Sequence, residues 1–441
     1  MRNPAELTVA EAAAEIAAGS LRPSALTEAY IDQTEEREGD IQAWAYFGAD
    51  LARMTARLAD TLPVEHPLHG IPFGAKDIFE TVDMPTGYGT PIYHRHYGAR
   101  DAASVALLKE VGAILLGKAV TTELAHFHPG KTRNPHALGH TPGGSSSGSA
   151  AAVAAGMVPF ALGTQTTGSV LRPASYCGVF GFKPSFGDVS RSGVFECVAS
   201  FDTVGWFTRS VEDVEIVRQA LVRVPVRPLP KTQLTGLRIG LFRGSEWDKA
   251  DGYTKDHVEG AGTTLAKAGA AVSDVETPPW FRDITELHRQ VAGFEFARAI
   301  AFERVERGRQ LSPKLVEGRC GDGLALSYDD YVGAQDTLAN ARAAFAELMQ
   351  SYDVLITPAA PGEAWEGLGA TGDPVFNTAW TALHVPAASV PAFKGPSGLP
   401  VGLQIVGRYR QDAALLAAAK AISRAFDVET VRPLSSVQRP S

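Results

Sequence analysis

The chain repeatedly places a helix-forming segment directly before a short apolar run, with a glycine at two of the three junctions. This order limits the folds open to it. It occurs at 101–110 before 113–116, at 149–155 before 158–162, and in the segment that follows Ser210 before 237–242. Asp101 and Ser210 are the expected caps of the first and third helices. Helices that alternate with buried strands indicate a sheet covered by helices on both faces, so we expect an α/β fold.

The remaining segments suggest one domain over residues 1–441. Thr8 and Glu11 fit a capping box that opens a helix ending near Gly19, and Ser24 can begin a second helix that runs to about Arg37. We expect an N-terminal helical portion (1–60), a core that carries the chemistry (61–210), a proline-rich internal linker (224–236) and a second part that completes the sheet and the pocket (237–441). Within this last part, 278–350 is expected to be mainly helical.

Composition narrows the classes of partner. The 441 residues are 45% hydrophobic and 20% charged and carry a net charge of −8 without a long basic run, so we expect no nucleic-acid partner and instead a small-molecule one. No apolar stretch is long enough for a membrane helix, and the first residues lack a signal-peptide core, so we expect no membrane partner and a cytoplasmic location. Three cysteines without a CxxC pair are expected to be buried free thiols (Cys177, Cys197 and Cys320).

Two glycine- and serine-rich segments carry the candidate chemistry. They are 143–149, which contains Ser145, and 163–174, which contains Ser169. Upstream, Lys76 lies in an apolar, glycine-flanked segment, which suits a lysine directed into the interior, where desolvation lowers its pKa. Serine hydroxyls are poor nucleophiles unless activated, and glycine-rich turns let backbone N–H groups face a developing oxyanion. This combination points to acyl transfer.

Other interpretations of these motifs are weaker. Residues 144–148 match G-x-S-x-G, which would make Ser146 the nucleophile of an α/β-hydrolase, but the preceding segment is polar and broken by proline. The same loop can form an anion nest, although it lacks the ending of a phosphate-binding P-loop. Two His-x-His pairs (94–96 and 126–128) have a spacing that metal sites use, but no further ligands complete them, so we expect no metal.

Taken together, these segments resemble the amidase signature family. The likeness rests on Gly-Ile-Pro-Phe-Gly-Ala-Lys76-Asp, on Gly-Gly-Ser145-Ser-Ser-Gly-Ser and on Gly-Thr-Gln-Thr-Thr-Gly-Ser169-Val-Leu-Arg172-Pro-Ala, and it continues through 353–358 and 398–407. The 24-residue separation of the two serines is also the family's. The resemblance implies a mixed central β-sheet flanked on both faces by helices and a Ser-cisSer-Lys triad without a cofactor. Ser169 would be the nucleophile, Ser145 the bridging serine in a cis peptide, and Lys76 the base.

The resemblance also implies a reaction. A small carboxamide or related acyl-nitrogen bond would be hydrolysed to a carboxylate and ammonia or an amine through an acyl-Ser169 intermediate, with the oxyanion held by backbone N–H groups of 166–169, namely Thr166, Thr167, Gly168 and Ser169. The alternative is a glutaminase-like subunit of a tRNA-dependent amidotransferase. Gln165 stands where such subunits usually have aspartate, which favours the independent amidase. The same resemblance favours a homodimer.

Two positions depart from the common pattern. Thr167 replaces a glycine found in much of the family, and a β-branched residue disfavours positive φ. Arg172 follows Ser169 by three residues, as in a malonamidase-like branch, where it can hold a substrate carboxylate; a structural pairing is the other interpretation. Substrate contacts are expected from Arg172, Ser146 and Gly144, and pocket walls from loops 125–135, 196–202 and 360–384.

Overall fold

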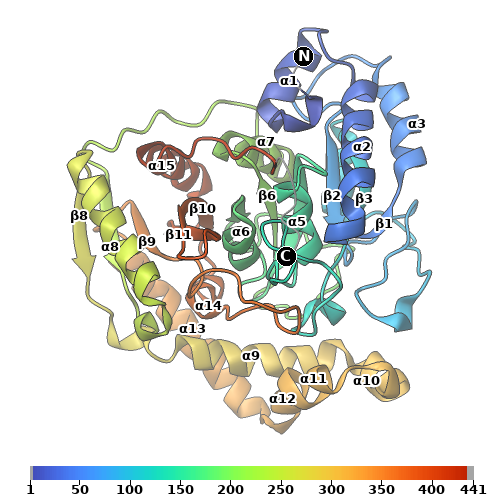
Figure 1. The fold of residues 1–441 in the computed structure, drawn as a ribbon. Coiled ribbons are helices and arrows are strands. Elements are labelled where there is room, and N and C mark those ends of the chain that lie inside the picture. Colours follow the sequence, from blue (N-terminus) through green and yellow to red (C-terminus); the bar gives the residue numbers. More distant parts are fainter. Residues whose placement is uncertain (1–2, 435–441) are drawn as a thin grey trace.

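The computed structural model describes residues 3–434 and contains one mixed sheet of eleven strands in the order β1-β3-β2-β4-β6-β5-β10-β11-β9-β7-β8 (Figure 1). The strands are β1 (Trp44–Phe47), β2 (Pro72–Lys76), β3 (Ile114–Ala119), β4 (Phe160–Gln165), β5 (Phe180–Lys183), β6 (Thr203–Thr208), β7 (Arg238–Phe242), β8 (Ala271–Val275), β9 (Val354–Pro358), β10 (Ala387–Lys394) and β11 (Pro400–Val406). This is the α/β architecture with a mixed sheet that the sequence predicted.

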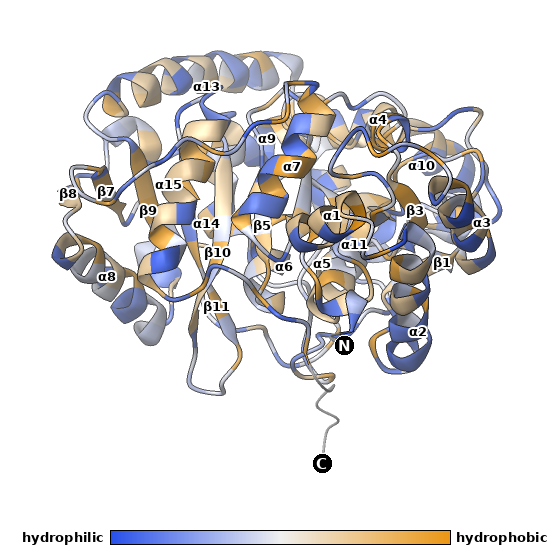
Figure 2. Ribbon diagram, turned by 90° about the horizontal axis from the view of Figure 1, so that it is seen from above, coloured by the Kyte–Doolittle hydropathy of each residue, from blue (hydrophilic) through white to orange (hydrophobic). Residues whose placement is uncertain are grey.

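Helices cover the sheet. They are α1 (Val9–Ala17), α2 (Pro23–Ile41), α3 (Ala49–Ala59), α4 (Ala103–Glu110), α5 (Ser147–Ala154), α6 (Leu171–Cys177), α7 (Val211–Val222), α8 (Gly252–Lys267), α9 (Ile284–Ala299), α10 (Ala301–Arg307), α11 (Pro313–Leu315), α12 (Gly321–Ala325), α13 (Tyr328–Leu348), α14 (Val375–Ala382) and α15 (Asp412–Ala425). Figure 1 shows α9 to α13 lying together across one end of the molecule. Figure 2 shows hydrophilic residues on outer helices such as α2 and α7. No helix between residues 3 and 434 is long and apolar enough to cross a membrane.

The strands that carry the candidate site lie in the buried centre of the sheet. Strand β2 pairs in parallel with β3 on one side and β4 on the other, and all its residues are buried. Helix α5 packs near these strands because Gly148 lacks a side chain: a Cβ there would lie 2.2 Å from the Ala43 carbonyl oxygen. The Gly148 N–H instead donates to the Val120 carbonyl at 2.9 Å. This close approach brings the 143–149 loop to the ends of β2 and β4.

Local signals placed several helix ends correctly. Thr8 and Glu11 form the expected capping box of α1, and the Ser210 side chain accepts from the Asp213 N–H at the start of α7. Segment 224–236 contains no helix or strand, as its prolines predicted. The predominantly helical character of 278–350 is likewise confirmed.

Other boundaries differ from the expectation for identifiable reasons. Asp101 does not cap α4; its carboxylate instead accepts from the Val82 N–H and from Lys109 Nζ. Helix α2 begins at Pro23, whose fixed φ suits a first helical position, and it continues to Ile41 rather than ending near Arg37. The α5 helix starts two residues before 149, and the following strand starts at 160 rather than 158.

Candidate active site

Lys76 lies at the carboxyl end of β2, and its side chain is fully buried. Its Nζ donates to Ser145 Oγ at 2.7 Å and to Thr164 Oγ1 at 2.8 Å. Burial lowers the pKa of Lys76 to about 7, against the opposing influence of Cys197 and Asp202. At neutral pH a substantial fraction of this amine is therefore uncharged.

Ser145 connects the lysine to the surface of a pocket. The Gly144–Ser145 peptide bond is cis, and the preceding Gly143 has φ of 82°. Arg172 Nη2 donates to the Gly144 carbonyl at 2.6 Å, which holds the loop against helix α6. Ser145 is nearly buried, with 4% of its surface exposed, and it lines the pocket.

Ser169 lies in the turn between β4 and α6 and is partly exposed to the same pocket. Gln165 organises this turn: its Oε1 accepts from the N–H groups of Val170 and Leu171, both at 3.0 Å, and its Nε2 donates to Thr381 Oγ1 at 3.0 Å. An amide supplies both a donor and an acceptor, whereas an ionised carboxylate only accepts. Gln165 therefore joins the start of α6 to helix α14.

The turn before Ser169 is held from several directions. Thr166 Oγ1 donates to the buried carboxylate of Asp202 at 2.5 Å, and His288 Nε2 donates to the Thr166 carbonyl at 2.8 Å. Thr381 Oγ1 donates to the Thr167 carbonyl at 2.9 Å. Burial lowers the pKa of His288 to about 3, so this imidazole is neutral. These contacts fix the backbone whose N–H groups were predicted to face an oxyanion.

Threonine is compatible with position 167 because this residue does not adopt positive φ. The substitution for glycine therefore brings no backbone strain of that kind. Gly168, in contrast, has no room for a side chain: a Cβ would lie 2.6 Å from Asn377 Oδ1. Position 167 thus accepts a side chain and position 168 does not, a difference that the sequence pattern alone did not show.

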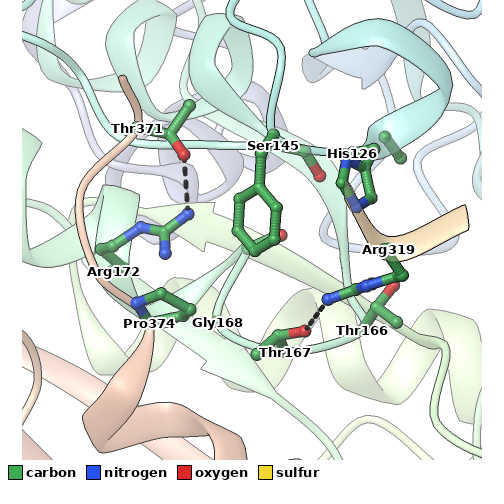
Figure 3. Close-up of a pocket in the computed structure, with 12 residues that line it drawn as sticks. His126, Ser145, Thr166, Thr167, Gly168, Arg172, Arg319, Thr371 and Pro374 are labelled. Atoms are coloured by element: carbon green, nitrogen blue, oxygen red, sulfur yellow. Dashed lines mark hydrogen bonds between the residues drawn. The ribbon is translucent and has the colours of Figure 1, made fainter. Parts of the chain in front are cut away.

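The pocket brings together the two serines and the 166–168 turn. Figure 3 shows Ser145 and the turn facing this space. Its walls come from segments far apart in the chain: Ala125, His126, Phe127, Ser145, Thr166, Thr167, Gly168, Ser169, Arg172, Arg319, Thr371 and Pro374. Lys76 lies behind Ser145. The expected loops 125–135 and 360–384 do contribute walls. Loop 196–202 supplies none of them and instead contributes Asp202, which supports Thr166.

Two predicted substrate contacts are not found on the pocket surface. Ser146 is fully buried, and its hydroxyl is hydrogen-bonded to the backbone N–H and C=O of Thr164, both at 3.3 Å. This position supports neither substrate binding by Ser146 nor its interpretation as a hydrolase nucleophile. Gly144 does not line the pocket either, and its carbonyl is engaged by Arg172.

Several residues at the site carried no recognised motif. Arg319 comes from the π-helical segment Val316–Cys320 (η7), and its Nη2 donates to Thr167 Oγ1 at 3.2 Å. His126 is 6% exposed, and Arg172 is 1% exposed. His126 has His-x-His spacing and lies in the 125–135 loop that was expected to form a pocket wall. No sequence signal pointed to Arg319, because its segment has the pattern of an ordinary polar helix.

The two His-x-His pairs have ordinary surroundings. His126 stacks on Phe296 with ring centroids 5.0 Å apart, and His96 Nε2 lies 3.5 Å from Glu80 Oε1. Across residues 3–434 no three His, Cys, Asp or Glu side chains gather as a metal-binding group. The three cysteines are free and buried, as expected.

Comparisons with known proteins identify the family of this chain. A family model described as amidase matches residues 25–416. The A subunit of glutamyl-tRNA(Gln) amidotransferase from Anaeromyxobacter sp. (strain K) is 33% identical, with 95% of this chain and 96% of the relative covered. Its counterpart from Exiguobacterium sibiricum is 32% identical, with 92% and 95% covered. These relatives do not support the specific malonamidase-like branch.

Solved structures give the same result. A structure from a vestigial protein complex that reveals the evolutionary origins of an s-triazine catabolic enzyme has a TM-score of 0.88 at 27% identity, with 97% of this chain and 100% of that chain covered. The native peptide amidase from Stenotrophomonas maltophilia has a TM-score of 0.82 at 28% identity, with 97% and 98% covered. The chain therefore belongs to the amidase family and is an enzyme that acts on C–N bonds.

Proposed function

We propose that this enzyme hydrolyses a small carboxamide, or a related acyl-nitrogen bond, through an acyl intermediate on Ser169. The observation that carries the proposal is the 2.7 Å contact between Lys76 Nζ and Ser145 Oγ, made by a buried lysine whose pKa is lowered to about 7. A neutral amine has two N–H groups and a lone pair. It can therefore donate to Thr164 and accept a proton from Ser145.

In the proposed reaction, Ser169 attacks the scissile carbonyl while its proton passes to Ser145 and from Ser145 to Lys76. The backbone N–H groups of 166–169 stabilise the oxyanion, and the restraints on Thr166 and Thr167 keep them in place. The departing nitrogen takes its proton back through Ser145. Water then attacks the acyl ester, which releases a carboxylate and free Ser169.

The relatives at 32–33% identity favour a second candidate, a glutaminase-like subunit that supplies ammonia within a tRNA-dependent complex. Two features support the independent amidase over it. No aspartate or glutamate among residues 3–434 lines the pocket, so no carboxylate on these walls pairs with the ammonium of a glutamine substrate. Gln165 is also fully used in supporting the α6 turn.

The deciding experiment is ammonia release by the purified protein alone from a library of amides, hydrazides and ureas. We expect turnover without a partner, and none in Ser169→Ala despite an unchanged circular-dichroism spectrum. Activity that appears only with a partner protein and tRNA would favour the amidotransferase function. A homodimer, which we also propose, is tested by light scattering of the same preparation.

A further inference from the structure

Within the described part of the chain, two guanidinium groups and no carboxylate line the pocket. Arg172 and Arg319 both line it, and neither forms an ion pair with any side chain of the described chain. Arg172 is 1% exposed, and only its Nη2 is hydrogen-bonded, to the Gly144 carbonyl and to Thr371 Oγ1; its Nε and Nη1 have no partner. Burial lowers the pKa of Arg172 to about 10 against the opposing influence of Tyr176 and Asp373, which still leaves it charged at neutral pH. A buried cation with free donors favours an anionic ligand.

Arg319 presents a second cation to the same space. Its guanidinium carbon lies 5.3 Å from the centre of the Phe127 ring, and its Nη2 donates to Thr167 Oγ1. The nearby carboxylate of Asp202 is already used, because it accepts from Thr166 Oγ1 and from two backbone N–H groups. The remaining donors of Arg319 are therefore available to a ligand.

His126 adds a neutral polar group to the pocket wall. It is 6% exposed, and neither ring nitrogen has a hydrogen-bond partner. Burial and the charges of Arg319 and Lys314 keep the pKa of His126 well below its usual value, so the ring offers one donor and one acceptor. Buried polar groups without a hydrogen-bond partner are uncommon in folded proteins. In this pocket, Arg172 and His126 have such groups, and Arg319 has donors beyond the one that bonds Thr167.

Figure 3 shows Arg172 and Arg319 on opposite sides of the pocket, with Ser145 above them in this view. We propose that the substrate is a small dianionic amide with one carboxylate on each side of the scissile amide, one held by Arg172 and the other by Arg319. This inference rests on the proposed hydrolysis at Ser169.

The test measures binding separately from turnover. Ser169→Ala protein is titrated calorimetrically with acetamide, with the monoanions malonamate, succinamate and N-acetylglycine, and with the dianions N-malonylglycine and N-succinylglycine. A charge-assisted arginine contact contributes roughly 10- to 100-fold in affinity. We expect a dianion to bind at least 10-fold more tightly than either corresponding monoanion. Equal affinities for dianions and monoanions would overturn the proposal.

Variants in the Ser169→Ala background assign the two ends. Arg319→Gln should remove the affinity gained from one carboxylate and keep the affinity gained from the other. Arg172→Lys should have the opposite effect. Arg298→Gln, an exposed arginine on α9, should leave all affinities unchanged. An Arg319→Gln variant that binds every compound with the affinity of the parent would contradict the second carboxylate site.

The same compounds are then tested with the wild-type enzyme. Tight binding of a dianion without its hydrolysis would reject the proposed function but retain the binding site. Hydrolysis of acetamide and of dianions at equal efficiency would retain the proposed function and reject the substrate class.

Discussion

At the scale of single residues, the buried amine of Lys76 combines its proposed function with a cost in stability. Lowering its pKa from 10.5 to about 7 corresponds to a penalty of about 5 kcal/mol, because each pKa unit is about 1.4 kcal/mol. The lysine donates only to two hydroxyl groups and has no ion pair within the described chain. The influence of Cys197 and Asp202 offsets only part of the desolvation of a full charge.

Lys76→Met should therefore be inactive yet more stable than the wild type. Methionine fills a similar volume without a charge to desolvate, and we expect the free energy of unfolding at pH 7 to rise by about 1–3 kcal/mol, measured by urea denaturation. A stabilised, inactive protein would separate the reaction role of this lysine from a structural one. Near-normal turnover in this variant would remove the proton relay.

The rate of acylation should rise with pH through about 7 and then level off. Only the uncharged amine accepts a proton, and the amine loses its charge as the pH rises through its pKa. Single-turnover measurements of acyl-enzyme formation between pH 5 and 9 isolate this step. A rate independent of pH across that range would contradict Lys76 as the base.

At the scale of elements, the junction of β4 with α6 positions Ser169. Gln165 ends the strand, accepts from the first N–H groups of the helix and donates to Thr381 on α14. Both Thr381 and Asn377 of α14 lie against the turn, the first through the Thr167 carbonyl and the second close to Gly168. The orientation of the nucleophile thus depends on a helix more than 200 residues away in the sequence.

Gln165→Leu tests this dependence. Two buried N–H groups lose their acceptor, so we expect a loss of about 2–3 kcal/mol in stability and at least a 10-fold fall in kcat with a smaller change in KM. Gln219→Leu is the matched control, since the Oε1 of this buried glutamine on α7 also accepts from a backbone N–H, that of Arg227, but the residue lies outside the pocket. It should cost stability without lowering kcat. Equal effects of both variants on kcat would contradict a positioning role for Gln165.

At the scale of the whole molecule, the two parts of the chain on either side of the 224–236 linker share one sheet. Strand β5 from the first part pairs with β10 from the second, and β7 and β8 extend the sheet beyond β9. The pocket also draws walls from both parts, with Ser169 from one and Arg319 from the other. We infer that tertiary contacts hold the parts together more than the linker does.

A protease site engineered into the exposed segment around Val226 tests this inference. Because few native contacts cross an extended proline-rich connection, cleavage should leave the two fragments associated in gel filtration, with most of the activity retained. Uncut protein of the same variant is the control. Fragments that separate without denaturant would show that the linker itself maintains the assembly.

The sequence by itself determined the fold class, the caps at Thr8 and Ser210, and the grouping of Lys76, Ser145 and Ser169 around one loop system. These features depend on local backbone hydrogen bonding, on hydrophobic periodicity and on motifs contained in short segments. Only the tertiary structure decided that Asp101 pairs elsewhere and that Ser146 is buried, and only it brought Arg319 to the pocket. Those outcomes depend on which distant segments pack together, because burial and the choice of hydrogen-bond partner are set by three-dimensional neighbours rather than by neighbours along the chain.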